Sequence, residues 1–357
     1  MSVAERITKL KPYTPSDRNV DSNNGWQYSD WNESHFKPSP KAIKSVQEAI
    51  LDNNFFQKYP NTNNRELLDL LSDYTGLESE NIAIYNGSDD ALKEIFISFL
   101  DENSKVMTYS PSYTQVDTFI SLSTDKHHKE KIIDPIDKHY YNFEDIKNYD
   151  LVYLANPNNP TGYLIDKTEI ELLVSKNLDT LFIIDEAYYE FSKNTSSDLV
   201  TKYNNIIITR TFSKAFGLAS LRIGYILASK EKIEFLNKIR NVKSVNQIAQ
   251  IAAAASLKDL DYLSACTGET KKSKEILEKF IKHSLTYKCF ENSHANFVLI
   301  KTKDSKDLIN VMLKNKILIR DRSYMSGLEN CVRITVGSIE NVKKIINILK
   351  ELDTIRG

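Results

Sequence analysis

Short apolar runs recur along the first two thirds of the chain, and each is bounded by polar or turn residues. They occupy residues 82–85, 106–109, 151–155, 181–185 and 206–210, and each predicts a β-strand. Apolar residues at helical spacing lie between several of the runs, at 90–100 and 167–176. Strands that alternate with helices predict βαβ units around a mostly parallel sheet with helices on both faces.

The pattern changes after about residue 243. Helical spacing continues through 245–257 and 271–282, strands are predicted at 296–301, 317–320 and 331–336, and a helix is predicted at 339–352. We therefore predict an α/β fold, with a mostly parallel sheet flanked by helices and a smaller α+β C-terminal domain. The predicted parts are a polar, Asn-rich N-terminal arm at 1–30, a large domain at 31–244 and a small domain at 245–357.

Composition excludes several classes of function. The 357 residues carry 47 Lys and Arg against 48 Asp and Glu, so a net charge of -1 gives no general attraction to nucleic acid or to a membrane. Cys266, Cys289 and Cys331 lie far apart without a CxxC pair, which favours neither a disulfide framework nor a metal site. No apolar stretch resembles a signal peptide or a membrane span, so we expect a soluble, cytoplasmic protein.

Polar side chains gather where the predicted parallel strands end, which is the edge at which open parallel sheets bind ligands. Ser88 and Asp89 follow Gly87 after the first strand, Asn159 lies in the loop ANPNNPTG, and Asp185 ends the run LFIID. The turn before Ser88 can offer backbone N–H groups to a phosphate, although an ordinary helix cap explains this turn equally well by itself.

The stretch TRTFSKAFGLASLRIGY, residues 209–225, places Lys214 close to the hydroxyls of Thr211 and Ser213 and to Arg222. A single lysine at such a position is most often a surface charge. The hydroxyls and the guanidinium can bind a phosphate, however, and a lysine that forms an imine, an aspartate for a pyridinium nitrogen and a phosphate site are the requirements of pyridoxal phosphate. No GxxxxGK[ST], GxGxxG, HExxH or GxSxG motif points to another chemistry.

With these motifs in this order, the sequence resembles the aspartate-aminotransferase superfamily, and within it the histidinol-phosphate aminotransferase group. The resemblance covers nearly the whole chain. It implies an aminotransferase that uses pyridoxal 5′-phosphate and forms a homodimer with shared active sites. The motifs that carry it are DWNESHFKPSP (30–40), KYP (58–60), NGSDDAL (86–92), PSY (111–113), NPNNPTG (156–162), DEAYYEF (185–191), TRTFSKAFGLASLRIGY (209–225) and VRITVG (332–337).

The resemblance also implies a role for each matching residue. Lys214 would form a Schiff base with the cofactor and transfer the proton as general base and acid. Asp185 would keep the pyridine nitrogen protonated, Asn159 and Tyr188 would hydrogen-bond the O3′ atom, and Tyr113 would stack on the ring. The cofactor phosphate would be bound by Ser88, Asp89, Thr211, Ser213 and Arg222, and by Tyr59 from a second subunit.

Two further positions concern the substrate. Arg333 matches the arginine that pairs with a substrate carboxylate, and Arg320 matches a position associated with the substrate phosphate. Arg322, two residues further on, leaves the choice of phosphate ligand open. The implied reaction moves an amino group between glutamate and a small phosphorylated ketone, such as imidazole acetol phosphate or dihydroxyacetone phosphate.

The segments expected to face the substrate depart from the pattern of the group. Where the group reads close to NENPYGPSP, this chain has Ser34-His35-Phe36-Lys37 before Pro38, and RNVKSVNQ stands where the group has a proline–tyrosine pair. The acceptor therefore stays open. The alternative is a pyridoxal-phosphate-dependent decarboxylase of threonine phosphate or serine phosphate. A pyridoxal-sensing regulator is disfavoured because no DNA-binding pattern is present.

Overall fold

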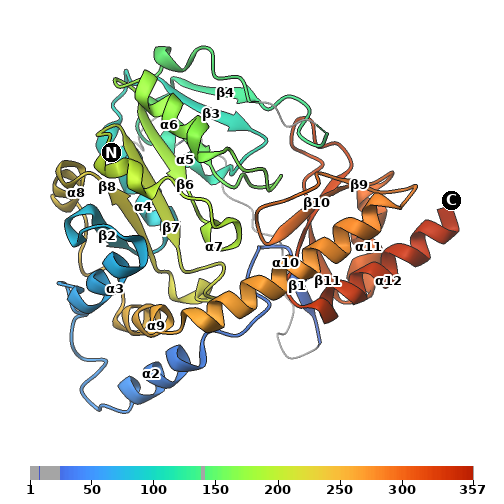
Figure 1. Cartoon of the computed structure of the whole chain (residues 1–357), viewed down its shortest axis with the longest axis horizontal. Coiled ribbons are helices and arrows are strands. Elements are labelled where there is room, and N and C mark those ends of the chain that lie inside the picture. Colours follow the sequence, from blue (N-terminus) through green and yellow to red (C-terminus); the bar gives the residue numbers. More distant parts are fainter. Residues whose placement is uncertain (1–7, 9–24, 138–140, 357) are drawn as a thin grey trace.

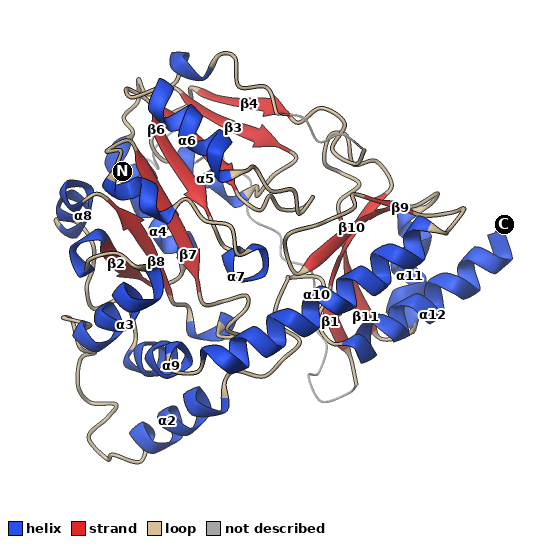
Figure 2. Cartoon of the chain, in the orientation of Figure 1, coloured by secondary structure: helices blue, strands red, loops and turns tan. Residues whose placement is uncertain are grey.

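The computed structural model describes Thr8, residues 25–137 and residues 141–356. Within these ranges the chain forms one seven-stranded sheet and one five-stranded sheet, each covered by helices (Figure 1, Figure 2). The long helix α10 (Leu260–Lys282) extends from the first part of the molecule to the second (Figure 1). None of the helices in the described ranges is both long and apolar enough to span a membrane.

The seven-stranded sheet contains all five strands that the apolar runs predict in the large domain, each to within one residue. Every neighbouring pair is parallel except those that involve β8, which runs antiparallel to β2 and β7. In spatial order the strands are β2 (Ile82–Tyr85), β8 (Gly224–Ala228), β7 (Ile206–Thr211), β6 (Leu181–Asp185), β5 (Leu151–Ala155), β3 (Val106–Ser110) and β4 (His127–Lys131).

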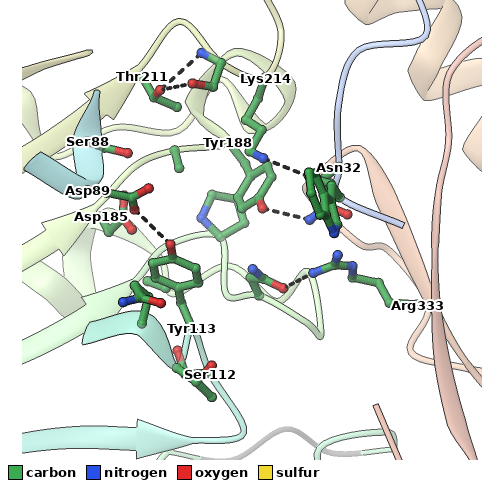
Figure 3. A pocket seen from close by; sticks show the side chains of 18 of the residues that line it. Asn32, Ser88, Asp89, Ser112, Tyr113, Asp185, Tyr188, Thr211, Lys214 and Arg333 are labelled. Atoms are coloured by element: carbon green, nitrogen blue, oxygen red, sulfur yellow. Dashed lines mark hydrogen bonds between the residues drawn. The ribbon is translucent and has the colours of Figure 1, made fainter. Parts of the chain in front are cut away.

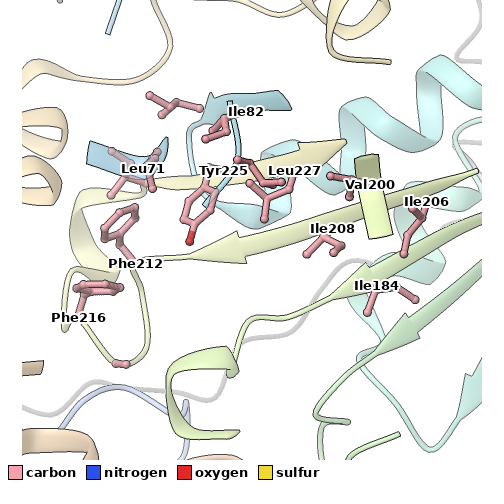
Figure 4. Close-up of a cluster of buried hydrophobic side chains, with 14 of the residues drawn as sticks. Leu71, Ile82, Ile184, Val200, Ile206, Ile208, Phe212, Phe216, Tyr225 and Leu227 are labelled. Carbon is pink, nitrogen blue, oxygen red and sulfur yellow. The ribbon is translucent and has the colours of Figure 1, made fainter. Parts of the chain in front are cut away.

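Both faces of this sheet are buried, which explains why its central strands are apolar at nearly every position. Alternate residues of one strand enter different clusters: Ile206 and Ile208 pack on one side (Figure 4), and Ile207 packs on the other. Each buried side chain of this size contributes about 1.5–3 kcal/mol. The first face is covered by α2 (Pro40–Ile50), α3 (Arg65–Thr75), α6 (Lys167–Lys176) and α9 (Gln247–Leu257), and the second by α4 (Ser88–Phe99), α5 (Gln115–Ile120) and α8 (Lys230–Asn237).

The smaller sheet confirms the strands and the final helix that were predicted for the C-terminal part. Its order is β1 (Gln27–Ser29), β11 (Ile317–Asp321), β12 (Cys331–Thr335), β10 (Phe297–Lys301) and β9 (Lys288–Cys289), and it packs against α10, α11 (Ser305–Lys314) and α12 (Ile339–Arg356). The remaining short elements are α7 (Tyr189–Ser192) and single 3₁₀ turns at Ser79–Asn81, Ile146–Asn148, Ser197–Thr201 and Ala219–Leu221.

The two hydrophobic cores that share helix α10 indicate where the domains divide. Buried alanines of α9 and Leu263 of α10 belong to the core cluster under the large sheet, whereas Leu277 and Ile281 of α10 belong to the cluster under the small sheet. We therefore propose that the division lies within α10, beyond the expected boundary at 245. Most of the expected arm at 1–30 lies outside the described residues, but β1, at its end, pairs parallel with β11 of the small sheet.

Candidate active site

A cavity of about 490 Å³ lies at the carboxyl ends of the parallel strands, and β11 and β12 of the small sheet form its opposite wall. Strands of the large sheet therefore bring together side chains that are far apart in sequence, as expected for an open parallel sheet. The predicted site residues that line the cavity are Ser88, Asp89, Tyr113, Asn159, Asp185, Tyr188, Thr211, Ser213, Lys214, Arg222, Arg320 and Arg333; Arg322 lines it as well.

Lys214 enters the cavity from the turn that follows β7 (Figure 3). Its Nζ atom donates to the backbone carbonyl of Trp31 at 3.0 Å. Burial, together with the positive charge of Arg333, lowers the pKa of Lys214 to about 8. About a tenth of the amine is then neutral at pH 7, so this lysine can act as a nucleophile and as a base near neutral pH.

Asp185 is 6% exposed and ends strand β6 at the floor of the cavity. Its two carboxyl oxygens accept hydrogen bonds from Thr209 Oγ1 at 2.9 Å and from Tyr153 Oη at 2.8 Å. Burial nevertheless raises the pKa of Asp185 to about 6. A cationic group in the cavity beside it would stabilise the charged form, so the position suits a protonated ring nitrogen.

A candidate anion site lies in the same cavity as Asp185, where Ser88 begins helix α4. Thr211 Oγ1 donates to Ser213 Oγ at 3.0 Å, and Arg222 donates to the same Ser213 oxygen at 3.3 Å. Asp89 accepts from Arg222 at 3.3 Å and from Tyr113 Oη at 2.8 Å. The helix N-terminus, the hydroxyls and the guanidinium together have the chemistry that binds a phosphate.

Two glycines allow the close packing around this anion site. Gly87 has φ +90°, and a Cβ atom placed on it would lie 2.9 Å from Arg222 Nη2. A Cβ atom on Gly224 would lie 2.7 Å from the backbone nitrogen of Ser88. A side chain at either position would displace groups that form the site, so both positions require glycine.

Tyr188 lies in the cavity between Asp185 and Arg333 (Figure 3), and Asn159 lines the same cavity. Tyr188 Oη accepts from Asn32 Nδ2 at 2.8 Å, and Asn159 Oδ1 accepts from Arg333 Nη1 at 2.6 Å. Burial raises the pKa of Tyr188, so its hydroxyl keeps its proton at neutral pH and can donate it to an oxygen in the cavity.

Some residues that shape the site were not predicted as site residues. Asn32 lies in a quoted motif but was given no role, although it binds Tyr188. Thr209 and Tyr153 donate hydrogen bonds to the carboxylate of Asp185. In the sequence, Thr209 could have been noticed as a polar residue in an apolar strand. In the structure it pairs in register with Asp185. Tyr59 lies outside the cavity of this chain; the residue is 79% exposed, and Lys243 Nζ lies 4.6 Å from the centre of its ring.

Known proteins resemble this chain over nearly its whole length. The family model for aminotransferase class I and II matches residues 27–349. A dihydroxyacetone phosphate transaminase of Campylobacter jejuni is 37% identical over 100% of this chain and 99% of the relative. A histidinol-phosphate aminotransferase of Methanocaldococcus jannaschii is 31% identical over 98% and 97%. The solved structure of histidinol-phosphate aminotransferase from Sinorhizobium meliloti in complex with pyridoxal-5′-phosphate has a TM-score of 0.86 at 25% identity and covers 99% of this chain and 98% of that chain.

Proposed function

The chain belongs to the aminotransferase class I and II family, and we propose that it moves an amino group between glutamate and a small phosphorylated ketone. The observation that carries the proposal is the composition of one cavity: a lysine and an aspartate with shifted pKa values lie on one side. On the other side lie arginines that form no ion pair with any carboxylate of the described residues. The name of the Campylobacter jejuni relative makes dihydroxyacetone phosphate the first acceptor to test, and imidazole acetol phosphate the second.

The cofactor is pyridoxal 5′-phosphate, and the donor set of the cavity fits it. When bound, the cofactor supplies an aldehyde carbon and an electron-withdrawing ring. Lys214 would hold it covalently through its amine, and Asp185 would keep the ring nitrogen protonated. Tyr188 and Asn159 would bind the ring hydroxyl oxygen, and Tyr113 would lie against the ring. The phosphate would lie among Ser88, Asp89, Thr211, Ser213 and Arg222.

The side chains of this protein would then perform the proton transfer and the binding. Lys214 would take the proton from the substrate Cα atom, which its lowered pKa permits near neutral pH. Arg333 binds the α-carboxylate of glutamate with its guanidinium, which Asn159 orients through the 2.6 Å hydrogen bond. Arg320, on the neighbouring strand, binds the second anion of the substrate.

We further propose a cytoplasmic homodimer in which Tyr59 contacts the cofactor phosphate of the partner subunit. Large apolar side chains are exposed between α2 and α3, with Leu51 at 80%, Phe56 at 73% and Tyr59 at 79%. Exposed apolar groups concentrated in one segment are typical of a contact surface. Cys266, Cys289 and Cys331 are all unpaired, which fits a reducing compartment. Sedimentation of the purified protein tests the dimer, and a monomer at micromolar concentration would contradict it.

A single-turnover experiment tests the reaction. Incubation of the cofactor-loaded enzyme with glutamate should release one equivalent of 2-oxoglutarate and shift the absorbance of the cofactor. Addition of dihydroxyacetone phosphate should restore the initial spectrum. The decarboxylase alternative predicts a different outcome, which is carbon dioxide from phosphoserine or phosphothreonine with no 2-oxoglutarate from glutamate.

A further inference from the structure

We infer that Asn32 is a positioning residue for Tyr188. Its amide donates to the Tyr188 hydroxyl and thereby directs the proton of that hydroxyl toward the ring hydroxyl oxygen of the cofactor. This role rests on the part of the proposed function that places Tyr188 against the ring. It does not depend on the identity of the substrate, so it applies to a transaminase and to a decarboxylase alike.

The small sheet fixes the direction of the Asn32 amide. Asn32 is 1% exposed. Thr335, the last residue of β12, accepts from the Asn32 backbone nitrogen at 3.0 Å and donates to Asn32 Oδ1 at 3.1 Å. Asn296, next to β10, donates to the Asn32 backbone carbonyl at 3.2 Å. Because the amide oxygen is held by Thr335, the amide nitrogen faces away from the small sheet and donates to Tyr188 Oη at 2.8 Å (Figure 3).

This arrangement leaves the Tyr188 hydroxyl a single direction in which to donate. A tyrosine hydroxyl has one proton and can also accept, whereas an amide NH₂ group can only donate. Tyr188 therefore accepts from Asn32, and its own proton is left for an acceptor in the cavity. The Tyr188 ring also packs edge to face against Phe297, with 5.2 Å between the ring centres. A hydroxyl that accepts one hydrogen bond is polarised and becomes a better donor in the next.

Asn32 also connects Tyr188 to the strand that carries Arg333. Thr335 lies two residues after Arg333 in β12, so the two side chains project from the same face of the strand. Arg333 Nη2 donates to the backbone carbonyl of Asp30 at 2.5 Å, two residues before Asn32. The segment 30–32 is thus held by two side chains of β12, and through Asn32 it passes this position on to Tyr188.

The test is a pH titration of the absorbance of the cofactor-loaded protein without substrate. A hydrogen bond from Tyr188 withdraws charge from the ring oxygen, so its loss lets the nearby Lys214 nitrogen keep its proton to higher pH. Asn32→Gly removes the amide without backbone strain, because Asn32 has φ +57°, which glycine adopts readily. We expect the midpoint to rise by about 0.5–1 pH unit, as for one neutral hydrogen bond, and by about 1–2 pH units in Tyr188→Phe.

A double variant separates positioning from packing. If Asn32 acts through Tyr188, Asn32→Gly adds no further shift in a Tyr188→Phe background. Thr335→Val, outside the cavity, should shift the midpoint in the same direction by less, and it provides the test if Asn32→Gly does not fold. Asn64→Gly is the matched control: Asn64 is also buried, with φ +47°, but donates to Thr62 O away from the cavity, so it should titrate as wild type does.

The outcomes distinguish the role of Asn32 from the proposed function. A midpoint that is unchanged in Asn32→Gly but raised in Tyr188→Phe would overturn the inference and leave the contact of Tyr188 with the ring intact. The same shift from Asn32→Gly in the wild-type and Tyr188→Phe backgrounds would also overturn it, because Asn32 would then act by another route. An unchanged midpoint in Tyr188→Phe would overturn both. Since no substrate is present, the reaction class does not affect these results.

Discussion

The buried arginine at the end of β7 and the three arginines of the small-sheet wall differ in their partners. Arg210, 1% exposed at the end of β7, donates to Glu186 at 2.9 Å and to Thr195 at 2.6 Å, and its guanidinium lies 3.7 Å from the centre of the Tyr189 ring. Arg320, Arg322 and Arg333 share one wall of the cavity without any carboxylate partner in the described part of the chain.

The difference separates a structural cation from cations for which we propose a binding role. Arg210 and Glu186 neutralise each other and join the motifs DEAYYEF and TRTFSKAF, so they hold the strand end that carries Asp185 next to the turn that carries Lys214. A buried charge is costly unless it is paired. Among the residues that the structure describes, the arginines of the small sheet form no ion pair, and we expect a bound anion to supply the missing charge, at some cost in stability without it.

The largest effect is expected from a comparison of two buried lysines. Burial lowers the pKa of Lys214 and of Lys274 to about 8 in each case, but Lys274 donates to the backbone carbonyls of Ser293 and Ala295 and lies outside the cavity. Lys214→Met should reduce turnover at least about 10³-fold and remove the absorbance of the covalently held cofactor. Lys274→Met should keep that absorbance and lower only the unfolding temperature. Normal turnover by Lys214→Met would show that the site is assigned wrongly.

The second prediction tests the structural arginine. Arg210→Leu leaves Glu186 buried without its cation, and should lower the free energy of unfolding by about 3–5 kcal/mol. The double variant Arg210→Leu with Glu186→Leu should recover much of this loss, because neither charge then stays unpaired. Urea unfolding of the cofactor-free proteins measures both values. A double variant as unstable as the single one would mean that packing, and not charge, dominates here.

The third prediction concerns pH. The pKa of Asp185 is raised from 3.8 to about 6, so between these values the folded protein holds a proton that the unfolded chain has lost. Stability of the cofactor-free protein should therefore fall as pH rises through this window, by up to about 3 kcal/mol from this group. Asp185→Asn removes the effect, and should be more stable than wild type above pH 6 but not at pH 4. A difference that is independent of pH would contradict the assignment. Urea titrations at both pH values provide the measurement.

The smallest expected effect is the change in unfolding free energy of an Arg322 variant, which we compare with that of the Arg210 variant. Arg322→Leu removes a cation that forms no ion pair in the described ranges of the chain, so the unfolding free energy should stay unchanged or rise by about 1 kcal/mol. Thermal unfolding of the cofactor-loaded variant, in buffer without phosphate, is the measurement. A loss of stability comparable to that of Arg210→Leu would place Arg322 with the structural arginines and remove the contrast.

Local patterns were sufficient to predict much of the fold. The strands β2, β3, β5, β6 and β7 are runs of apolar residues between turn residues, and their bounds follow from that contrast. β8 was not predicted, although its sequence GYILA is equally apolar, because it begins inside the motif with Lys214 and only the short 3₁₀ turn Ala219–Leu221 precedes it. β1 could not be predicted either, since only its pairing with β11, almost at the other end of the chain, makes three residues a strand.

The sequence by itself determined the family, the cofactor chemistry and most residues of the candidate site. These depend on short motifs, and the carboxyl ends of parallel strands always meet at one edge of a sheet. The tertiary structure alone decided which charges are paired. Arg210 lies between two threonines and Arg322 lies between Asp321 and Ser323, so neither local sequence shows a pairing. The contact of Arg210 with Glu186 comes from adjacent strands, and the place of Arg322 comes from the register of β11 against β12. Electrostatic roles follow from distances in space, which no single stretch of sequence contains.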